Sequence, residues 1–240
     1  MKNENGDIMK GYKGFDKDMK CSDMQFEVGK TYEHDGDVKL CKSRFHFCEN
    51  PLDIFNYYPP SGSKFAEIEA EEVSTEKESD SKRCSKKLTV KALVDFSVMI
   101  KASVEFVFKT IKASKETQAT TGNYANSATT GDYAHSATTG EDAHSATTGC
   151  RANSATTGNY AHSATTGDRA NSAVEGKNSI AAGIGINNSA KGALGCWIVL
   201  AEWEYDNEWK IKSVKSALVD GKKIKVDTFY TLKNGKFVKE

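Results

Sequence analysis

The sequence predicts a mainly β protein: a nonapeptide-repeat β-solenoid, or β-roll, with an N-terminal α+β domain, a connecting helix and a C-terminal antiparallel β-meander. Three observations predict this class. Glycine recurs at every ninth position from Gly122 to Gly176. Each interval repeats the run Ser-Ala-Thr-Thr-Gly or a close variant, as at residues 127–131. The segments on both sides lose this period and alternate apolar with polar residues, as half-buried strands do.

A nine-residue unit is too short for a helical hairpin and fits half a coil of a β-solenoid, with one short strand and one turn. We expect a strand such as residues 134–139 in each unit. We expect the glycine to form the turn, because glycine reaches positive φ without steric cost. The two variable residues after each glycine, such as Asn123 and Tyr124, then form an exposed corner.

Two units per coil would place alternate units on the same face. His144 and His162 then stack in one column, and His135, Asn153 and Asn171 stack in another, with rungs about 4.8 Å apart. We interpret both columns as polar ladders. Metal binding by stacked histidines is the alternative, and no metal is predicted.

The repeat is poor in bulky apolar residues, so each coil gains little from burial. Such a thin solenoid needs capped ends or lateral association with copies of itself. The prediction is a homo-oligomer, with a trimer favoured over a dimer. The residues assigned to the interface between chains are Ala128, Thr129, Ala137, Thr138, Ala146, Ala155, Ala164, Ile180 and Ile184.

The sequence disfavours three other functions of the repeat. Calcium-binding nonapeptides need a regular aspartate in each turn, whereas Asp132, Asp142 and Asp168 are irregular. An ice-binding solenoid offers two outward threonines per unit, and this repeat offers one. A DNA mimic needs dense surface acid, and this stretch is nearly neutral. A structural spacer or oligomerisation module is the preferred interpretation.

The last repeats carry the run Asn-Ser-Ile-Ala-Ala-Gly-Ile-Gly-Ile-Asn-Asn-Ser-Ala-Lys-Gly at residues 178–192. This run resembles the head repeat of trimeric autotransporter adhesins, and the similarity covers about residues 118–195. The resemblance implies a left-handed parallel β-roll packed as a trimer. The sequence departs from that pattern in its uniform nine-residue period and in Thr-Thr where the family has Val or Ile.

Composition limits the partners. Lys plus Arg and Asp plus Glu both number 33, so the net charge is zero, and no general attraction to nucleic acid or to an anionic membrane is expected. No apolar run is long enough for a signal peptide or a membrane span, which predicts a cytosolic protein. The six cysteines are scattered without a Cys-x-x-Cys pair and are expected to be free thiols.

The N-terminal α+β domain is assigned to residues 1–93. Asn50 and Pro51 predict a helix start, with Asn50 as the N-cap, and the helix continues over 52–58 until two prolines stop it. The remaining predicted elements are strands at 9–15, 28–32, 38–41, 64–70 and 86–93, and a mobile, charged, serine-rich loop at 73–85.

The connecting helix is assigned to 94–117, with Asp95 as its cap and an expected end near Lys112. The solenoid follows over 118–195. The meander is assigned to 196–240, where Asp206-Asn207, Asp220-Gly221 and Asn234-Gly235 are hairpin signals. Its tryptophans are expected to seal the end of the solenoid.

The segments that flank the repeat carry a second resemblance. Residues 11–16 (Gly-Tyr-Lys-Gly-Phe-Asp), 45–58 (Phe-His-Phe-Cys-Glu-Asn-Pro-Leu-Asp-Ile-Phe-Asn-Tyr-Tyr) and 195–203 (Gly-Cys-Trp-Ile-Val-Leu-Ala-Glu-Trp) resemble an uncharacterised family of phages and prophages of gut Firmicutes. The resemblance implies no known activity. It implies a phage setting, where small proteins of the host-cell cytosol often block host defences.

Two arrangements of residues in the N-terminal domain could form a catalytic or a metal site. Lys13, Tyr57, Glu67 and Glu69 distantly resemble the ADP-ribosyltransferase layout, in which a first-strand residue, an aromatic shelf and a late glutamate surround the nicotinamide. Cys41, His46 and Cys48 offer a zinc site, but their spacing does not match paired zinc knuckles. No phosphate-cradling glycine loop, Ser-His-Asp pattern or nucleic-acid patch is present in the sequence.

The sequence therefore favours binding without catalysis and without a cofactor. The solenoid would assemble the chains, and the N-terminal domains would present a multivalent surface through Tyr12, His46, Tyr57 and Tyr58. The expected target is a host defence protein or its nucleotide signal, with no membrane and no nucleic acid as partner. An ADP-ribosyltransferase-like enzyme and a virion structural component are the alternatives.

Overall fold

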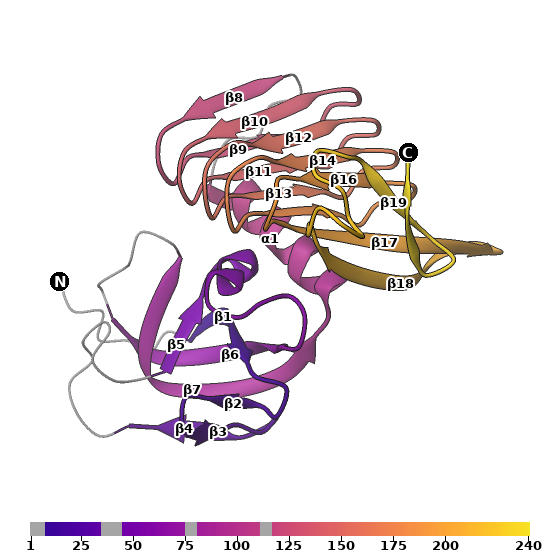
Figure 1. The fold of residues 1–240 in the computed structure, drawn as a ribbon. Coiled ribbons are helices and arrows are strands. Elements are labelled where there is room, and N and C mark those ends of the chain that lie inside the picture. The colour runs from indigo at the N-terminus through magenta and orange to yellow at the C-terminus, as the bar shows by residue number, and fades with distance from the viewer. Residues whose placement is uncertain (1–7, 35–44, 75–80, 111–116) are drawn as a thin grey trace. The chain divides into compact units, whose positions relative to one another are not determined.

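The computed structural model describes residues 8–34, 45–74, 81–110 and 117–240. It confirms the predicted class, a mainly β chain with a central β-solenoid. The chain divides into two compact units, Met1–Asp95 and Phe96–Glu240, so the helix, the solenoid and the C-terminal strands belong to one unit (Figure 1). None of the helices in the described part combines the length and hydrophobicity that a membrane crossing requires.

The first unit is an antiparallel sheet in the order β4-β7-β5-β1-β6. Its long strand β7 also pairs with β6, so the sheet curls back on itself around a core that contains Phe15, Phe47, Ile68 and Leu88. The strands are β1 (Met9–Phe15), β4 (Thr31–Glu33), β5 (Phe45–Cys48), β6 (Lys64–Val73) and β7 (Lys82–Val94), with a small hairpin of β2 (Lys20–Cys21) and β3 (Met24–Gln25).

Three elements predicted in this unit differ from the structure or lie outside its described residues. The predicted helix is present, capped by the Asn50 side chain, but it is the short 3-10 helix η1 (Pro51–Asn56). The predicted loop at 73–85 is wrong at its end, since β7 begins at Lys82 and pairs there with Cys48 of β5. The predicted strand at 38–41 lies outside the described residues.

The solenoid has two units per coil, as predicted, and its strands form two parallel sheets (Figure 1). Partner residues lie 18 positions apart, so His144 is in register with His162, and His135 with Asn153. The first sheet contains β8 (Gln118–Thr121), β10 (His135–Thr139), β12 (Asn153–Thr156), β14 (Asn171–Val174) and β16 (Ser189–Gly192). The second contains β9 (Asn126–Thr129), β11 (His144–Thr147), β13 (His162–Thr165), β15 (Ile180–Gly183) and β17 (Trp197–Asp206).

The repeated glycines serve close packing more than turn geometry. Positive φ falls on the second residue after each glycine, as at Tyr124 and Tyr133. A Cβ at Gly158 would overlap the carbonyl oxygen of Gly140 one coil away, and the same holds at Gly149 with Gly131. The expectation that glycine supplies positive φ is therefore wrong at most repeats, because the constraint comes from the neighbouring coil.

The interior of the solenoid is a hydroxyl ladder. Serines from successive half coils meet inside, and Ser154 Oγ donates to Ser145 Oγ at 2.8 Å, which donates to Ser136 Oγ at 2.9 Å. Threonines fill the neighbouring column, and the hydroxyls of Thr129, Thr138, Thr147 and Thr156 are buried without a hydrogen-bond partner among the described residues. Towards the C-terminal end the interior becomes apolar, beginning with Val174.

Helix α1 (Phe96–Thr110) packs on the second sheet, along β9, β11 and β13. Its buried side includes Met99, Ile100, Val104 and Val107, whereas Val98 is exposed. Most residues that the sequence assigned to contacts between chains are buried inside this single unit, namely Ala128, Thr129, Thr138, Ala146, Ala164, Ile180 and Ile184. Only Ala137 and Ala155, on the sheet that α1 does not cover, remain partly exposed.

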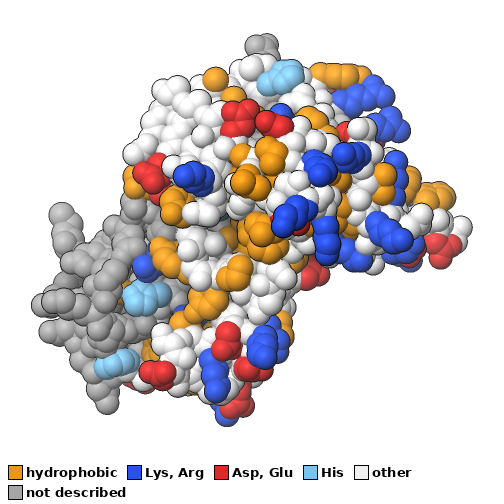
Figure 2. Space-filling view, viewed as in Figure 1, with side chains coloured by type: hydrophobic (Ala, Val, Ile, Leu, Met, Phe, Trp, Pro, Cys, Tyr) orange, Lys and Arg blue, Asp and Glu red, His pale blue; other side chains and the backbone are white. Residues whose placement is uncertain are grey.

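The C-terminal strands form two hairpins, one on each sheet. β18 (Glu208–Leu218) pairs with β17, and β19 (Tyr230–Lys233) joins β16 and pairs with β20 (Lys236–Lys239). The Glu202 carboxylate accepts the backbone amides of Asn234 and Gly235, and Trp203 Nε1 donates to the Ile184 carbonyl. Basic side chains gather over these strands (Figure 2), and lysines on edge strands oppose pairing with other chains.

We predict that Gly158→Ala destabilises the protein by more than about 2 kcal/mol, because the added methyl group forces two stacked coils apart. Denaturant unfolding followed by far-ultraviolet circular dichroism would measure the change. Glu141→Ala, at an exposed corner of the same solenoid, is the control and should change little. Equal effects of both substitutions would contradict the close-approach argument.

The two interior columns should respond in opposite ways. Thr156→Val removes a buried hydroxyl that has no partner and keeps the side-chain shape, so we expect a gain of about 1 kcal/mol. The partner of Thr156 on the next coil is already a fully buried valine, Val174. Ser154→Ala breaks the ladder and should cost about 1 kcal/mol. Destabilisation by Thr156→Val would show that its hydroxyl is satisfied in solution.

Candidate functional site

A pocket of about 510 Å³ lies in the first unit. All four residues predicted to bind a target, Tyr12, His46, Tyr57 and Tyr58, line it. The volume falls in the range of small-molecule sites. The other lining residues are Lys13, Gly14, Cys21, Phe47, Cys48, Ile54, Asn56 and Lys82.

Two glycines on β1 allow the aromatic walls to approach the backbone. A Cβ on Gly11 would overlap the Phe47 ring, and a Cβ on Gly14 would overlap Tyr58 and Ile54. Any side chain at these positions would push Phe47 or Tyr58 away from β1. The Gly-Tyr-Lys-Gly run therefore holds Lys13 between two points of close packing.

A polar network fixes the wall that carries Tyr57 and Tyr58. The Asn50 backbone amide donates to Ser81 Oγ at 2.8 Å, and the Ser81 amide donates to an oxygen of Asp53 at 2.9 Å. Asn50 also caps η1 by accepting from the Leu52 amide. These bonds attach η1 to the residue just before β7, which orients the tyrosines that follow the helix.

Lys13 is almost fully buried, with 4% of its surface exposed. Its ammonium donates to the His46 carbonyl at 2.9 Å and contacts Cys21 Sγ at 3.5 Å. The rings of Phe26 and Phe15 have their centroids 5.4 and 5.8 Å from the nitrogen. Burial lowers the pKa of Lys13, and the opposing effect of Cys21 is smaller.

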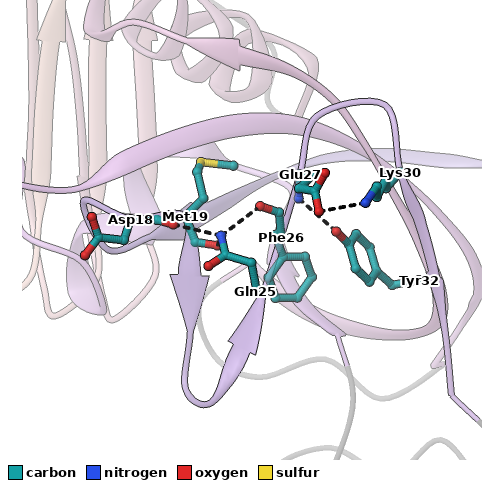
Figure 3. Close-up of polar contacts among 7 residues, drawn as sticks. All are labelled: Asp18, Met19, Gln25, Phe26, Glu27, Lys30 and Tyr32. Carbon is teal, nitrogen blue, oxygen red and sulfur yellow. Dashed lines mark hydrogen bonds and ion pairs between the residues drawn. The ribbon is translucent and has the colours of Figure 1, made fainter.

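The β2–β3 hairpin brings Cys21 to the pocket. Gln25 Nε2 donates to the carbonyls of Asp18 and Phe26, at 2.8 and 3.2 Å, which holds the hairpin closed (Figure 3). The Glu27 amide donates to the Tyr32 hydroxyl at 2.8 Å, and the Tyr32 ring packs at a tilt against the Phe26 ring, with centroids 4.7 Å apart (Figure 3). The hairpin and the core beneath Lys13 are thus one packed assembly.

The outer part of the pocket is aromatic and basic. The Lys82 ammonium lies 4.6 Å from the centre of the Tyr57 ring, a cation–π distance. Tyr57 is 46% exposed and presents its ring to solvent. Burial, and then a hydrogen bond with Cys21, raises the pKa of the Tyr58 hydroxyl, so this group stays protonated at neutral pH.

The structure does not bring together the four residues of the enzyme alternative. Lys13 is opposite Ala66 in the β1–β6 pairing, and Ala66 faces the core. Glu67 and Glu69 lie on the other face of β6, because successive side chains of a strand alternate. Glu69 forms an ion pair with Lys91 at 3.0 Å. Only Lys13 and Tyr57 of this set line the pocket.

The suggested metal ligands are only partly described. Cys41 lies outside the described residues, and His46 and Cys48 both line the pocket. The five described cysteines are free thiols, as predicted for them. In the solenoid, His144 and His162 stack with ring centres 5.3 Å apart, which confirms the predicted column.

Comparison with known proteins identifies one similarity. Residues 9–102 match a protein family described as a domain of unknown function, DUF7666. The match begins at β1 and ends within α1, so it includes every residue that lines the pocket. No curated protein and no solved structure matches the chain.

Sequence reasoning missed three features of this site. Lys82 was placed in a loop, and its position beside Tyr57 depends on the β5–β7 pairing. Cys21 reaches the pocket through a two-residue strand that propensity alone does not indicate. The glycines at positions 11 and 14 could have indicated the close packing around Lys13, because glycine inside a strand often marks close approach of another group.

The burial of Lys13 predicts a pH dependence of stability. Its pKa is lower in the folded protein than the ordinary 10.5, so between these two values the unfolded chain holds more protons. The free energy of unfolding should therefore rise with pH across that interval. Lys13→Met should remove this contribution, and denaturant titrations at several pH values would measure it. Lys10→Met, on an exposed lysine of the same strand, is the control; equal pH slopes for both variants would contradict the argument.

Proposed function

We propose that this chain is a non-catalytic, oligomeric binding protein of phage type, which acts in the host-cell cytosol as a counter-defence inhibitor. The pocket of the first unit takes the target, a host defence protein or its nucleotide signal. The observation that carries this proposal is the pocket itself, where tyrosines and lysines surround a volume suited to a small ligand.

The repeat resemblance supports assembly into a trimer. A trimer would present three pockets, and linked sites raise the overall affinity without new contacts at each site. The sheet that α1 leaves uncovered offers the surface for a neighbouring chain, since Ala137 and Ala155 form a flat column of small, partly exposed side chains there. Of the four residues of the enzyme alternative, the two glutamates, Glu67 and Glu69, do not line the pocket.

Assembly can be tested by light scattering coupled to size-exclusion chromatography. We expect a trimer for the wild-type chain and monomers for Ala155→Arg, which places a charge on the uncovered sheet. Glu141→Arg, at an exposed corner of the solenoid, is the control and should remain trimeric. A monomeric wild-type protein would refute the oligomer proposal.

Target binding can be tested by capture from host cytosol, followed by mass spectrometry of proteins and small molecules. Wild-type protein should retain a target that Tyr57→Ala loses, because Tyr57 is the most exposed aromatic residue of the pocket wall. Tyr133→Ala, at a solenoid corner, is the matched control. A target retained equally by both variants would mean that the pocket is not the binding site.

A further inference from the structure

Lys13 is a buried cation for which the described structure provides no carboxylate. Its ammonium contacts a carbonyl oxygen, a thiol and two aromatic rings. A buried ammonium without a counter-charge is costly, and its pKa falls as a result. An anion that entered the pocket would relieve this cost.

The outer wall is suited to a flat ring. Tyr12, Tyr57 and Tyr58 supply aromatic surface, and base–aromatic stacking is a general way of holding a planar group. Lys82 beside Tyr57 places a second positive charge at the same wall. A ligand with both a ring and an anionic group can use the two kinds of lining at once.

We propose that the pocket binds a small aromatic anion of the mononucleotide class, with its ring against Tyr57 and its anionic group near Lys82 and Lys13. This inference rests on the proposed function and specifies the ligand. A pocket of about 510 Å³ has room for one such molecule and agrees with the small-molecule range. No covalent step is involved.

Binding should take up a proton at pH values where Lys13 is partly deprotonated in the free protein. The groups around Lys13 are Cys21 on β2, His46 and Cys48 on β5, Tyr58 after η1 and Lys82 on β7. A bound anion next to Lys13 stabilises the ammonium and raises its pKa again. Between the pKa of Lys13 in the free protein and its higher pKa in the complex, the complex holds more protons than the free protein, so affinity should fall as pH rises across that interval.

Isothermal titration calorimetry with adenosine 5′-monophosphate as the probe tests the proposal. Adenosine supplies the ring without the anion, and ribose 5-phosphate supplies the anion without the ring; both should bind at least about tenfold more weakly. A 5′-phosphorylated oligonucleotide is a further probe. If it binds more tightly than adenosine 5′-monophosphate, the ligand is the phosphorylated end of a nucleic acid. Titrations at several pH values below 10.5, each in two buffers of different ionisation enthalpy, should reveal the interval in which a proton is taken up.

Lys82→Gln, at the outer wall, should weaken the binding of adenosine 5′-monophosphate roughly tenfold or more, because a charge-assisted contact is lost. Lys91→Gln, on the same strand but outside the pocket, is the control and should bind like wild type. Lys13→Met should abolish proton uptake, and its fold can be checked by circular dichroism. Should Lys13→Met fail to fold, Lys82→Gln still decides the matter.

Equal binding of adenosine and adenosine 5′-monophosphate, or no effect of Lys82→Gln, would overturn the inference. Different outcomes would refute the proposed function and the proposed ligand class. If the captured target is a protein lost in Tyr57→Ala while nucleotides do not bind, the ligand class is wrong and the binding function stands. If neither nucleotides nor any cytosolic target depend on the pocket, both proposals fail.

Discussion

The solenoid depends on how closely the backbones of successive coils approach at the repeated glycine. At Gly149, Gly158, Gly167 and Gly176 a methyl group would occupy the position of a carbonyl oxygen one coil below. This contact sets the corner of every coil and leaves the positive φ to the second residue after the glycine. The side chain at that second residue is therefore free to vary, which is why tyrosine, aspartate, arginine and asparagine all occur there.

The interior shows how a chain with few large apolar residues can form a packed core. Serine hydroxyls donate to one another from coil to coil, and each of these hydrogen bonds contributes only about 1 kcal/mol in net terms. The threonine column works against this gain, since its hydroxyls lack partners among the described residues. The apolar end that begins at Val174, together with α1 on the second sheet, supplies the burial that the repeats lack. Stability should therefore be concentrated towards the C-terminal coils.

The sequence was sufficient for features that repeat or that depend on local chemistry. The nine-residue period gave the two-unit coil, the register of His144 with His162 and the exposed corners. Asn50 and Pro51 gave the capped helix, whereas the buried hydrogen bonds of Asn50 and Asp53 with Ser81, about 30 residues away, depend on tertiary pairing. The alanines between the interior serines and threonines point outward in both sheets, and the sequence could not show that α1 covers those of the second sheet alone. Ala128 is thus buried and Ala137 partly exposed, although their sequence contexts are nearly identical.

The contrast between local features and tertiary pairing also explains which parts of the site could be predicted from the sequence. Four residues that the sequence predicted to bind a target, Tyr12, His46, Tyr57 and Tyr58, line one pocket. The charges of the pocket depend on tertiary pairing, which brings Lys82 beside Tyr57 and buries Lys13 beneath Phe26. All the lining residues lie between Tyr12 and Lys82, so the number of solenoid repeats can change without altering the pocket. Coils can therefore be added to or removed from the solenoid while the residues that line the pocket stay the same.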